Sequence, residues 1–296
     1  MDQAENLRRI IKNNAMSKEN LARVITITSG KGGVGKSSTA VNLAIHLSRL
    51  GNRVIIIDAD FGLANVEVML GIRPRYTLAD VMFKGKSLSE VITTGPENIG
   101  FLSGGSGIKE LSNMNKDQVV NFITKLYELD RMADIIIIDT GAGISDSVME
   151  FVVASQELLL VATPEPTSIT DAYALLKTLN RRGGFDKKNV SIKMIGNRVT
   201  KYEDGIELFE KLSVVVKKFL GIEFSLLGLI PYDDKCQKSI MKQAPVSIEY
   251  PNAAASRAYE NIAYKLNLAP SGKSGEKKSR GIRSLFSNIV KMKYQR

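Results

Sequence analysis

The sequence predicts an α/β protein built around a doubly wound, mostly parallel sheet. Three observations lead to this fold class: recurring runs of β-branched and aliphatic residues, helical patterns between those runs, and a glycine-rich segment after the first run. The runs are apolar throughout rather than alternating, which is typical of strands buried on both faces. Strands that alternate with helices favour right-handed crossovers, with ligands bound beyond the carboxyl ends of the strands.

The expected elements fill residues 23–268, which we predict to form one domain. Strands are expected at Val24–Thr28, Val54–Ile57, Ile135–Ile138, Leu158–Ala162, Ile192–Ile195 and Leu226–Ile230. Helices are expected near residues 36–50, 115–129, 145–155, 167–181 and 203–219. The chain shows no internal repeat.

The composition excludes several classes of protein. With 296 residues, 44% of them apolar, the chain can bury a full core. Cys236 is its one cysteine and His46 its one histidine. Disulfide scaffolds, cysteine-rich zinc sites, four-thiolate iron–sulfur clusters within one chain and Ser-His-Asp sites are therefore not expected. No apolar run reaches the ~18 residues of a membrane span and the N-terminus lacks a secretory leader, so we expect a cytoplasmic protein.

A phosphate-binding loop follows the first expected strand. Its residues are Gly30, Lys31, Gly32, Gly33, Val34, Gly35, Lys36, Ser37 and Ser38. They satisfy the pattern G-x-x-x-x-G-K-[ST], in which glycines let several backbone N–H groups point at one phosphate. Lys36 is expected to reach the β- and γ-phosphates, and Ser37 to ligate Mg²⁺. The position between a strand and a helix favours this interpretation over a glycine-rich turn without a nucleotide.

Two of the expected strands end in carboxylates. The run Val54–Ile57 is followed by Asp58 and Asp60, and the run Ile135–Ile138 is followed by Asp139. The carboxyl ends of parallel strands meet beside the phosphate loop, where Asp139 is expected to hold Mg²⁺ through water. The alternative for each aspartate is a turn or a helix cap. Its recurrence at two independent strand ends favours the metal site.

The two ends of the chain differ from the domain between them. Most of the net charge of +10 lies between Lys273 and Arg296, so the body is close to neutral. Residues 1–22 form a polar arm, residues 269–279 read as a flexible linker, and residues 280–296 regain helical periodicity. The apolar stripe of this last segment is Ile282, Leu285, Phe286, Ile289 and Val290. A basic amphipathic helix behind a linker predicts an anchor on an anionic lipid membrane; the alternative is a helix docked on the protein's own body.

The position of Lys31 resembles the deviant Walker A motif of the MinD/ParA ATPase family. This resemblance implies a MinD-like P-loop fold, ATP and Mg²⁺ as cofactors, and a face-to-face homodimer in which Lys31 contacts phosphate across the interface. The stretch after the second strand is similar to the family's switch I, which implies that Asp60 orients the attacking water and that Asp58 supports the magnesium shell. Lys31, Lys36 and Asp60 are thus the expected catalytic residues. A cation from the other subunit stabilises the transferring phosphate only in the dimer.

Two further segments are similar to parts of this family. The stretch from Asp139 to Gly143 resembles a Walker B strand leading into switch II, although Thr140-Gly141 stands where many relatives carry proline. The segments after the last two strands resemble those that hold adenine. The resemblance implies base contacts from Asn197, Arg198, Pro231 and Asp233. The alternative for these turn-forming residues is a purely local role.

The N-terminal arm carries the string D-Q-A-x-x-L-R, which resembles the motif of FlhG-type flagellar-number ATPases (also called YlxH or FleN). The resemblance implies that Gln3, Leu7 and Arg8 act on the flagellar SRP-type GTPase FlhF. It also implies control of flagellum number and placement, reversible binding at the inner face of the cell membrane, and flagellar switch-complex proteins as further partners. The alternative for the arm is an ordinary frayed helix.

Two other classes of function compete with this interpretation. A ParA-type DNA-segregation ATPase would need surface Lys and Arg for non-specific DNA binding, and the nearly neutral body disfavours it, so no specific nucleic acid is expected. A metabolic enzyme on the same fold would not need a targeting tail, and a reductase or iron–sulfur carrier would need cysteines that the sequence lacks.

Overall fold

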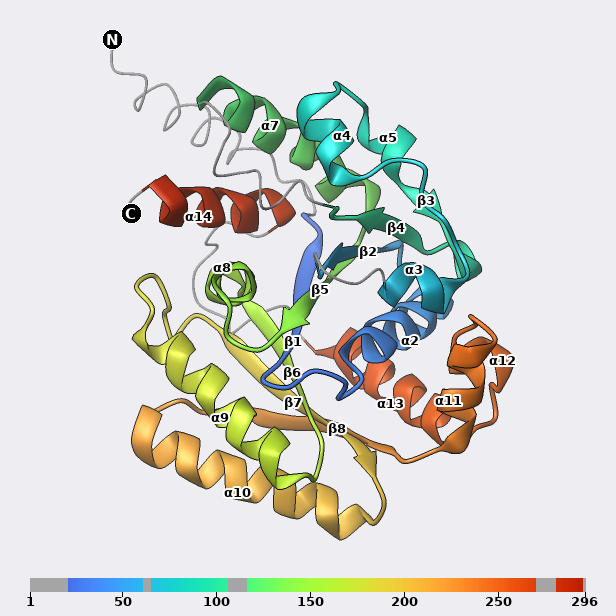
Figure 1. Ribbon diagram of the computed structural model, residues 1–296, viewed down its shortest axis with the longest axis vertical. Helices are drawn as coiled ribbons and strands as arrows, with labels where there is room; N and C mark the ends of the chain where they lie inside the picture. The colour runs from blue at the N-terminus through green and yellow to red at the C-terminus, as the bar shows by residue number, and fades with distance from the viewer. Residues whose placement is uncertain (1–20, 61–64, 106–115, 270–280, 295–296) are drawn as a thin grey trace.

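The computed structural model describes residues 21–60, 65–105, 116–269 and 281–294. They fold around an eight-stranded sheet of order β3-β4-β2-β5-β1-β6-β7-β8. All neighbouring strands are parallel except β3 and β4. The strands are β1 (Arg23–Ser29), β2 (Val54–Ala59), β3 (Thr93–Thr94), β4 (Gly100–Ser103), β5 (Ile135–Ala142), β6 (Glu157–Ala162), β7 (Ser191–Val199) and β8 (Ser225–Pro231). The predicted doubly wound, mostly parallel sheet is confirmed (Figure 1).

Helices cover both faces of the sheet, and the five expected ones are α2, α7, α8, α9 and α10. In Figure 1, α2 and α13 lie to the right of the strands, while α8, α9 and α14 lie to the left. The helices are α2 (Lys36–Arg49), α3 (Asn65–Leu70), α4 (Leu78–Phe83), α5 (Leu88–Val91), η2 (Pro96–Asn98), α7 (Lys116–Met132), α8 (Asp146–Ala154), α9 (Pro166–Arg181), α10 (Tyr202–Leu220), α11 (Asp234–Met241), α12 (Val246–Glu249), α13 (Ala254–Leu268) and α14 (Ile282–Tyr294).

The edge strand β3 and its neighbour β4 were not predicted. They contain only two and four residues, and β4 reads GFLS, with no β-branched run to mark it. The central strands were predictable because both of their faces are buried. In β5, Ile135 and Ile137 pack with α2 and α13, whereas Ile136 and Ile138 pack with α7, α8 and α14. A strand covered on both sides is therefore a nearly continuous apolar run, as in Ile135–Ile138.

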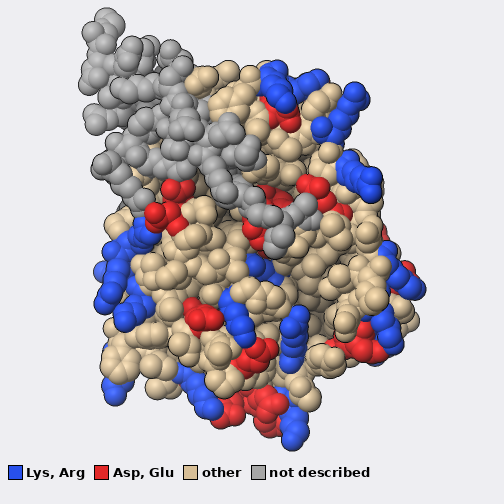
Figure 2. Space-filling view, in the orientation of Figure 1, with Lys and Arg blue, Asp and Glu red and all other residues tan. Residues whose placement is uncertain are grey.

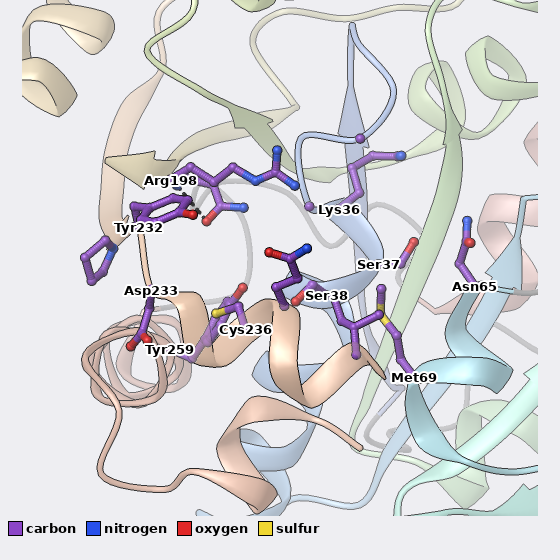
Figure 3. A pocket seen from close by; sticks show the side chains of 16 residues that line it. Lys36, Ser37, Ser38, Asn65, Met69, Arg198, Tyr232, Asp233, Cys236 and Tyr259 are labelled. Carbon is purple, nitrogen blue, oxygen red and sulfur yellow. Dashed lines mark hydrogen bonds between the residues drawn. The ribbon is translucent and has the colours of Figure 1, made fainter. Parts of the chain in front are cut away.

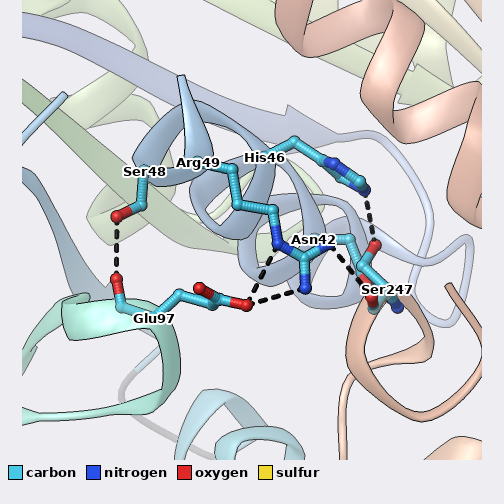
Figure 4. Close-up of polar contacts among 6 residues, drawn as sticks. All are labelled: Asn42, His46, Ser48, Arg49, Glu97 and Ser247. Carbon is cyan, nitrogen blue, oxygen red and sulfur yellow. Dashed lines mark hydrogen bonds and ion pairs between the residues drawn. The ribbon is translucent and has the colours of Figure 1, made fainter. Parts of the chain in front are cut away.

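Polar contacts tie the far end of α2 to α12 (Figure 4). His46 Nε2 lies 2.9 Å from Ser247 Oγ, and the Ser247 N–H donates to Asn42 Oδ1 at 3.0 Å. Arg49 donates to the Ser247 carbonyl and forms an ion pair with Glu97. Burial lowers the pKa of His46 to about 4, so the imidazole is neutral at physiological pH. The single histidine therefore has a structural role here.

The C-terminal helix α14 is amphipathic, as predicted, but its apolar stripe is buried in the protein itself. All five stripe residues are at most 9% exposed and belong to the hydrophobic cluster that contains the inner faces of α7 and α8. The ring of Phe286 meets those of Phe122 and Phe151 edge to face, with centroids 5.5 and 5.9 Å away. We predicted that the stripe binds a membrane, with docking on the protein's own body as the alternative. The structure shows the docked arrangement, because α7 and α8 present an aromatic groove that no local sequence pattern reveals.

The first turn of α14 is held by a buried carboxylate. Asp130, at the end of α7, accepts hydrogen bonds from the N–H groups of Ile282 at 2.8 Å and Arg283 at 3.4 Å. Gly281 has φ +97°, and a Cβ there would lie 2.5 Å from an Asp130 oxygen. Among the described helices, none is both long and apolar enough to cross a bilayer. The membrane role of the stripe stays a prediction that requires α14 to leave this groove.

Candidate nucleotide-binding site

The predicted phosphate loop lies between β1 and α2, at the carboxyl edge of the sheet. Gly35 caps α2 with φ +94°, a left-handed conformation that favours glycine. A Cβ on Gly35 would also lie 2.3 Å from Asn197 Nδ2, which donates to the Val34 carbonyl at 2.7 Å. At the start of the loop, a Cβ on Gly30 would lie 2.1 Å from the backbone of Asp171 in α9. The loop is thus fixed at both ends by other elements.

The three predicted carboxylates gather beside this loop. Asp58 and Asp139 are register partners on the neighbouring strands β2 and β5, and both are buried. Asp58 accepts a hydrogen bond from the Asp60 N–H at 2.9 Å. Thr140 donates its hydroxyl to the Ile27 carbonyl at 3.0 Å and so joins β5 to β1. The strand ends therefore converge as the sequence predicted.

The electrostatics of these carboxylates fit a cation. Both oxygens of Asp139 are buried and accept no hydrogen bond in the described part of the chain. Desolvation raises the pKa of Asp139 to about 6, although Lys36 and the nearby Ser37 hydroxyl oppose the rise. Desolvation and the charge of Asp139 raise the pKa of Asp58 to about 8. The described residues contain no cluster of three or more His, Cys, Asp or Glu that could hold a metal ion by itself. A magnesium ion would thus need phosphate or water oxygens besides Ser37 and Asp139.

A cleft of about 570 Å³ opens next to the loop, which suits a nucleotide (Figure 3). Nine predicted residues line it: Gly33, Gly35, Lys36, Ser37, Ser38, Asn197, Arg198, Pro231 and Asp233. Seven others complete the wall: Asn65, Met69, Tyr232, Cys236, Gln237, Ile240 and Tyr259. Figure 3 shows Arg198, Tyr232 and Asp233 on one side of the cleft, across from Ser37 and Asn65.

Part of this wall was recognisable in the sequence. Gln237 and Ile240 follow Asp233 by four and seven residues, the spacing of one helix face, and α11 begins directly after Asp233. Asp233 caps this helix and also accepts from the Ala255 N–H at 3.2 Å. Desolvation raises the pKa of Cys236 to about 11, so its thiol stays protonated. Tyr259 lies in α13, which no motif connected with the loop.

Two of the residues expected to contact the base, Asn197 and Arg198, take part in hydrogen bonds within the protein. Asn197 donates to the phosphate loop through Nδ2 and accepts from the Arg198 N–H at 2.9 Å through Oδ1. Arg198 itself has φ +56°, an uncommon conformation for a residue with a side chain. Asn197 therefore holds the loop and the strained residue next to the cleft in one arrangement. Whether Asn197, Arg198, Pro231 and Asp233 contact a base stays a prediction.

The family follows from sequence comparison. The ParA family model, described as NUBPL iron-transfer P-loop NTPase, matches residues 20–267. The chain belongs to the ParA/MinD family of P-loop NTPases. It is accordingly an ATPase of this family. The same fold appears in a chain of the MinC:MinD cell division protein complex of Aquifex aeolicus, with a TM-score of 0.64 and 26% identity over 88% of this chain and 100% of that chain.

Two relatives of this ParA/MinD protein are, by their names, an antiactivator and a flagellum site-determining protein. The chain is 41% identical over 248 residues to the antiactivator FleN of Pseudomonas aeruginosa, which covers 84% of this chain and 87% of FleN. It is 30% identical over 270 residues to the flagellum site-determining protein YlxH of Helicobacter pylori, which covers 91% and 90% of the two chains.

Several predicted residues lie outside the cleft. Lys31 of this ParA/MinD ATPase sits at the rim, where its ammonium donates to Glu165 and to Thr167. Gly30, Gly32 and Val34 shape the loop without lining the cleft. The proposed partner-binding residues Gln3, Leu7 and Arg8 lie outside the described part of the chain, as do most residues of the 269–279 linker.

Proposed function

We propose that this protein is a switch ATPase that dimerises with ATP, associates reversibly with the inner face of the cell membrane, and regulates the number and placement of flagella. The observation that carries the proposal is a complete phosphate site with a second lysine, Lys31, at its rim, in a chain 41% identical to FleN. The similarity to YlxH points to the same flagellar role. Dimerisation and membrane association are proposed from the resemblance of the sequence to the MinD/ParA family.

The buried groups of the site support Mg-dependent ATP hydrolysis. Lys36 and the loop N–H groups would hold the phosphates, while Ser37 and Asp139 would hold Mg²⁺, with Asp58 behind them. When bound, the ion neutralises charge that develops on the phosphate oxygens. Asp60 follows β2 directly and would orient the attacking water. Lys31 of a second subunit would complete the cationic surroundings of the transferring phosphate.

Membrane binding requires that α14 leave its groove. Helix α8 would connect ATP binding with the release of α14. It begins just after the switch residues at the end of β5, and its Phe151 packs against Phe286 of α14. A shift of the switch segment on ATP binding would move α8 and weaken the groove. Five apolar side chains contribute at most ~1.5–3 kcal/mol each in a membrane, and ordering a helix opposes this gain. Two helices on one dimer gain avidity of ~10²–10⁴, so dimerisation would make binding persist.

The flagellar partner is proposed from the N-terminal arm. Gln3, Leu7 and Arg8 would contact the SRP-type GTPase FlhF, and switch-complex proteins would be further partners. We expect deletion of residues 1–20 to leave ATP binding unchanged and to abolish stimulation of FlhF GTP hydrolysis in a reconstituted assay. Stimulation that survives the deletion would remove the arm from this role.

DNA segregation, the second candidate, has weaker support. Lys and Arg are interspersed with Asp and Glu over the face seen in Figure 2, rather than gathered into one basic patch. Non-specific DNA binding needs several cations that contact phosphates together. The iron transfer in the description of the family model also finds little support, because Cys236 is the one cysteine of the chain.

The mass of the full-length protein tests the central proposal. We expect a monomer with ADP and a dimer with ATP and Mg²⁺ in the Asp60→Ala variant, which should bind ATP but hydrolyse it poorly. The same ATP-bound variant should float with anionic vesicles, whereas the ADP form should not. A protein that stays monomeric at saturating ATP and Mg²⁺, or that floats equally with ADP, would contradict the proposed switch.

A further inference from the structure

The signature lysine is held by its own subunit. Lys31 Nζ lies 2.7 Å from Glu165 Oε2 and 2.7 Å from Thr167 Oγ1, both at the beginning of α9. The two charged side chains keep 33% and 52% of their surface exposed, so the contact is accessible at the rim. The ion pair therefore binds the Lys31 ammonium without burying it, so a competing anion such as a phosphate can displace the Glu165 carboxylate.

The position of this contact is fixed by the fold. The first turns of α9 pack so closely on the loop that Gly30 has no space for a Cβ against Asp171. Glu165 is the N-cap residue of α9, at the positive end of a 16-residue helix. That end of a helix repels an ammonium, so the contacts with Glu165 and Thr167 hold Lys31 at the beginning of α9. The hydrogen bond from Lys31 lowers the pKa of Glu165, which stays ionised at physiological pH.

We propose that Glu165, assisted by Thr167, is a positioning residue that restrains Lys31 in the monomer and thereby opposes ATP-dependent dimerisation. The inference rests on the proposed function, in which Lys31 must reach a phosphate of the partner. In that dimer each subunit gives up one Lys31–Glu165 contact, so the free energy of both contacts is subtracted from association. The restraint therefore raises the concentration of ATP-bound protein that is needed for dimers to form.

The test is the dimer dissociation constant of Glu165→Gln, measured by sedimentation with ATP and Mg²⁺ in the Asp60→Ala background. We expect this constant to fall about tenfold, which corresponds to about 1.4 kcal/mol for two exposed ion pairs. Thr167→Val should lower it by a smaller factor. The matched control is Glu207→Gln, which removes the exposed Lys211–Glu207 pair on α10 and should leave the constant unchanged.

A double-mutant cycle separates the restraint from a change in folding. In a Lys31→Met background, Glu165→Gln should have no further effect, because its partner is gone. In the variant that keeps Asp60, ATP turnover at limiting protein should rise with the dimer fraction, while turnover at saturating protein stays unchanged.

The outcomes distinguish the two proposals. If the Asp60→Ala parent fails to dimerise with ATP, the proposed function fails. If the parent dimerises and Glu165→Gln leaves its constant unchanged, the restraint is wrong. A weaker dimer in Glu165→Gln would also overturn it, because Glu165 would then act across the interface instead.

Discussion

Asp130 and Asp139 are both buried aspartates with a pKa raised to about 6, yet their surroundings differ. At the start of α14, both Asp130 oxygens accept backbone N–H groups. At the nucleotide edge, neither Asp139 oxygen has a hydrogen bond in the described structure. The fold itself satisfies the first carboxylate and leaves the second for a ligand. Burial alone thus does not mark a functional carboxylate; the missing partner does.

The largest effect on stability is expected in the groove between α7 and α8, where Asp130 caps the first turn of the bound helix α14. Phe122→Ala should reduce the free energy of unfolding by about 3–5 kcal/mol, because it opens a cavity beside Phe286. It should also free α14 with an intact apolar stripe. Amide exchange of α14 and flotation with anionic vesicles in the absence of ATP should both increase. The increase would show that packing holds the helix more strongly than the cap.

The matched variant is Phe286→Ala, which loosens the same contact from the helix side. It should also expose α14, but it removes an apolar side chain from the stripe itself. Vesicle binding should therefore rise less than in Phe122→Ala. Equal binding by both variants and the wild type without ATP would contradict a membrane role for this helix.

The next prediction concerns the unsatisfied carboxylate. Asp139→Asn should slow Mg-dependent ATP hydrolysis by about 10- to 100-fold, as expected for a group that holds a metal through water. The same change should stabilise the nucleotide-free protein near pH 7, because desolvation of this buried charge outweighs the favourable effect of Lys36 and Ser37. Steady-state turnover and thermal unfolding measure the two effects. Unchanged turnover would remove Asp139 from the metal site.

The stabilisation by Asp139→Asn should depend on pH with a defined sign. The folded-state pKa of Asp139 is raised to about 6, above the ordinary value of 3.8. The folded protein therefore binds the proton more tightly, and this contribution to stability is full below pH 3.8 and is lost as the pH rises through 6. The asparagine variant lacks this loss, so its advantage should grow between pH 4 and 7 to roughly 1–3 kcal/mol.

The smallest effect is expected at the satisfied carboxylate. Asp130→Ala should lower the free energy of unfolding by about 0.5–2 kcal/mol, as for other lost helix caps, and so with the opposite sign to Asp139→Asn. Amide exchange should rise first at Ile282 and Arg283. Asp130→Asn, which keeps one acceptor, should show a smaller rise. Unchanged exchange at these two residues would mean that the cap does not hold the helix.

Much of the nucleotide site was predictable because its signals are local. The glycine pattern requires residues that are neighbours in the chain, and the positions of Asp58 and Asp139 follow from strands that end at one edge of the sheet. The opposite wall was only partly predictable. Tyr259 reaches the cleft from α13, more than two hundred residues after the loop, and nothing in its local sequence shows that contact.

The sequence by itself determined six of the eight strands, five of the helices between them, the phosphate loop and the amphipathic character of residues 282–290, because each depends on residues close together in the chain. Only the tertiary structure decided what these parts contact. It placed the apolar stripe of α14 in a groove between α7 and α8, and it paired Lys31 with Glu165. The physical reason is that an apolar face or a charge specifies the chemistry of its partner, while the packing of distant elements specifies which partner is within reach.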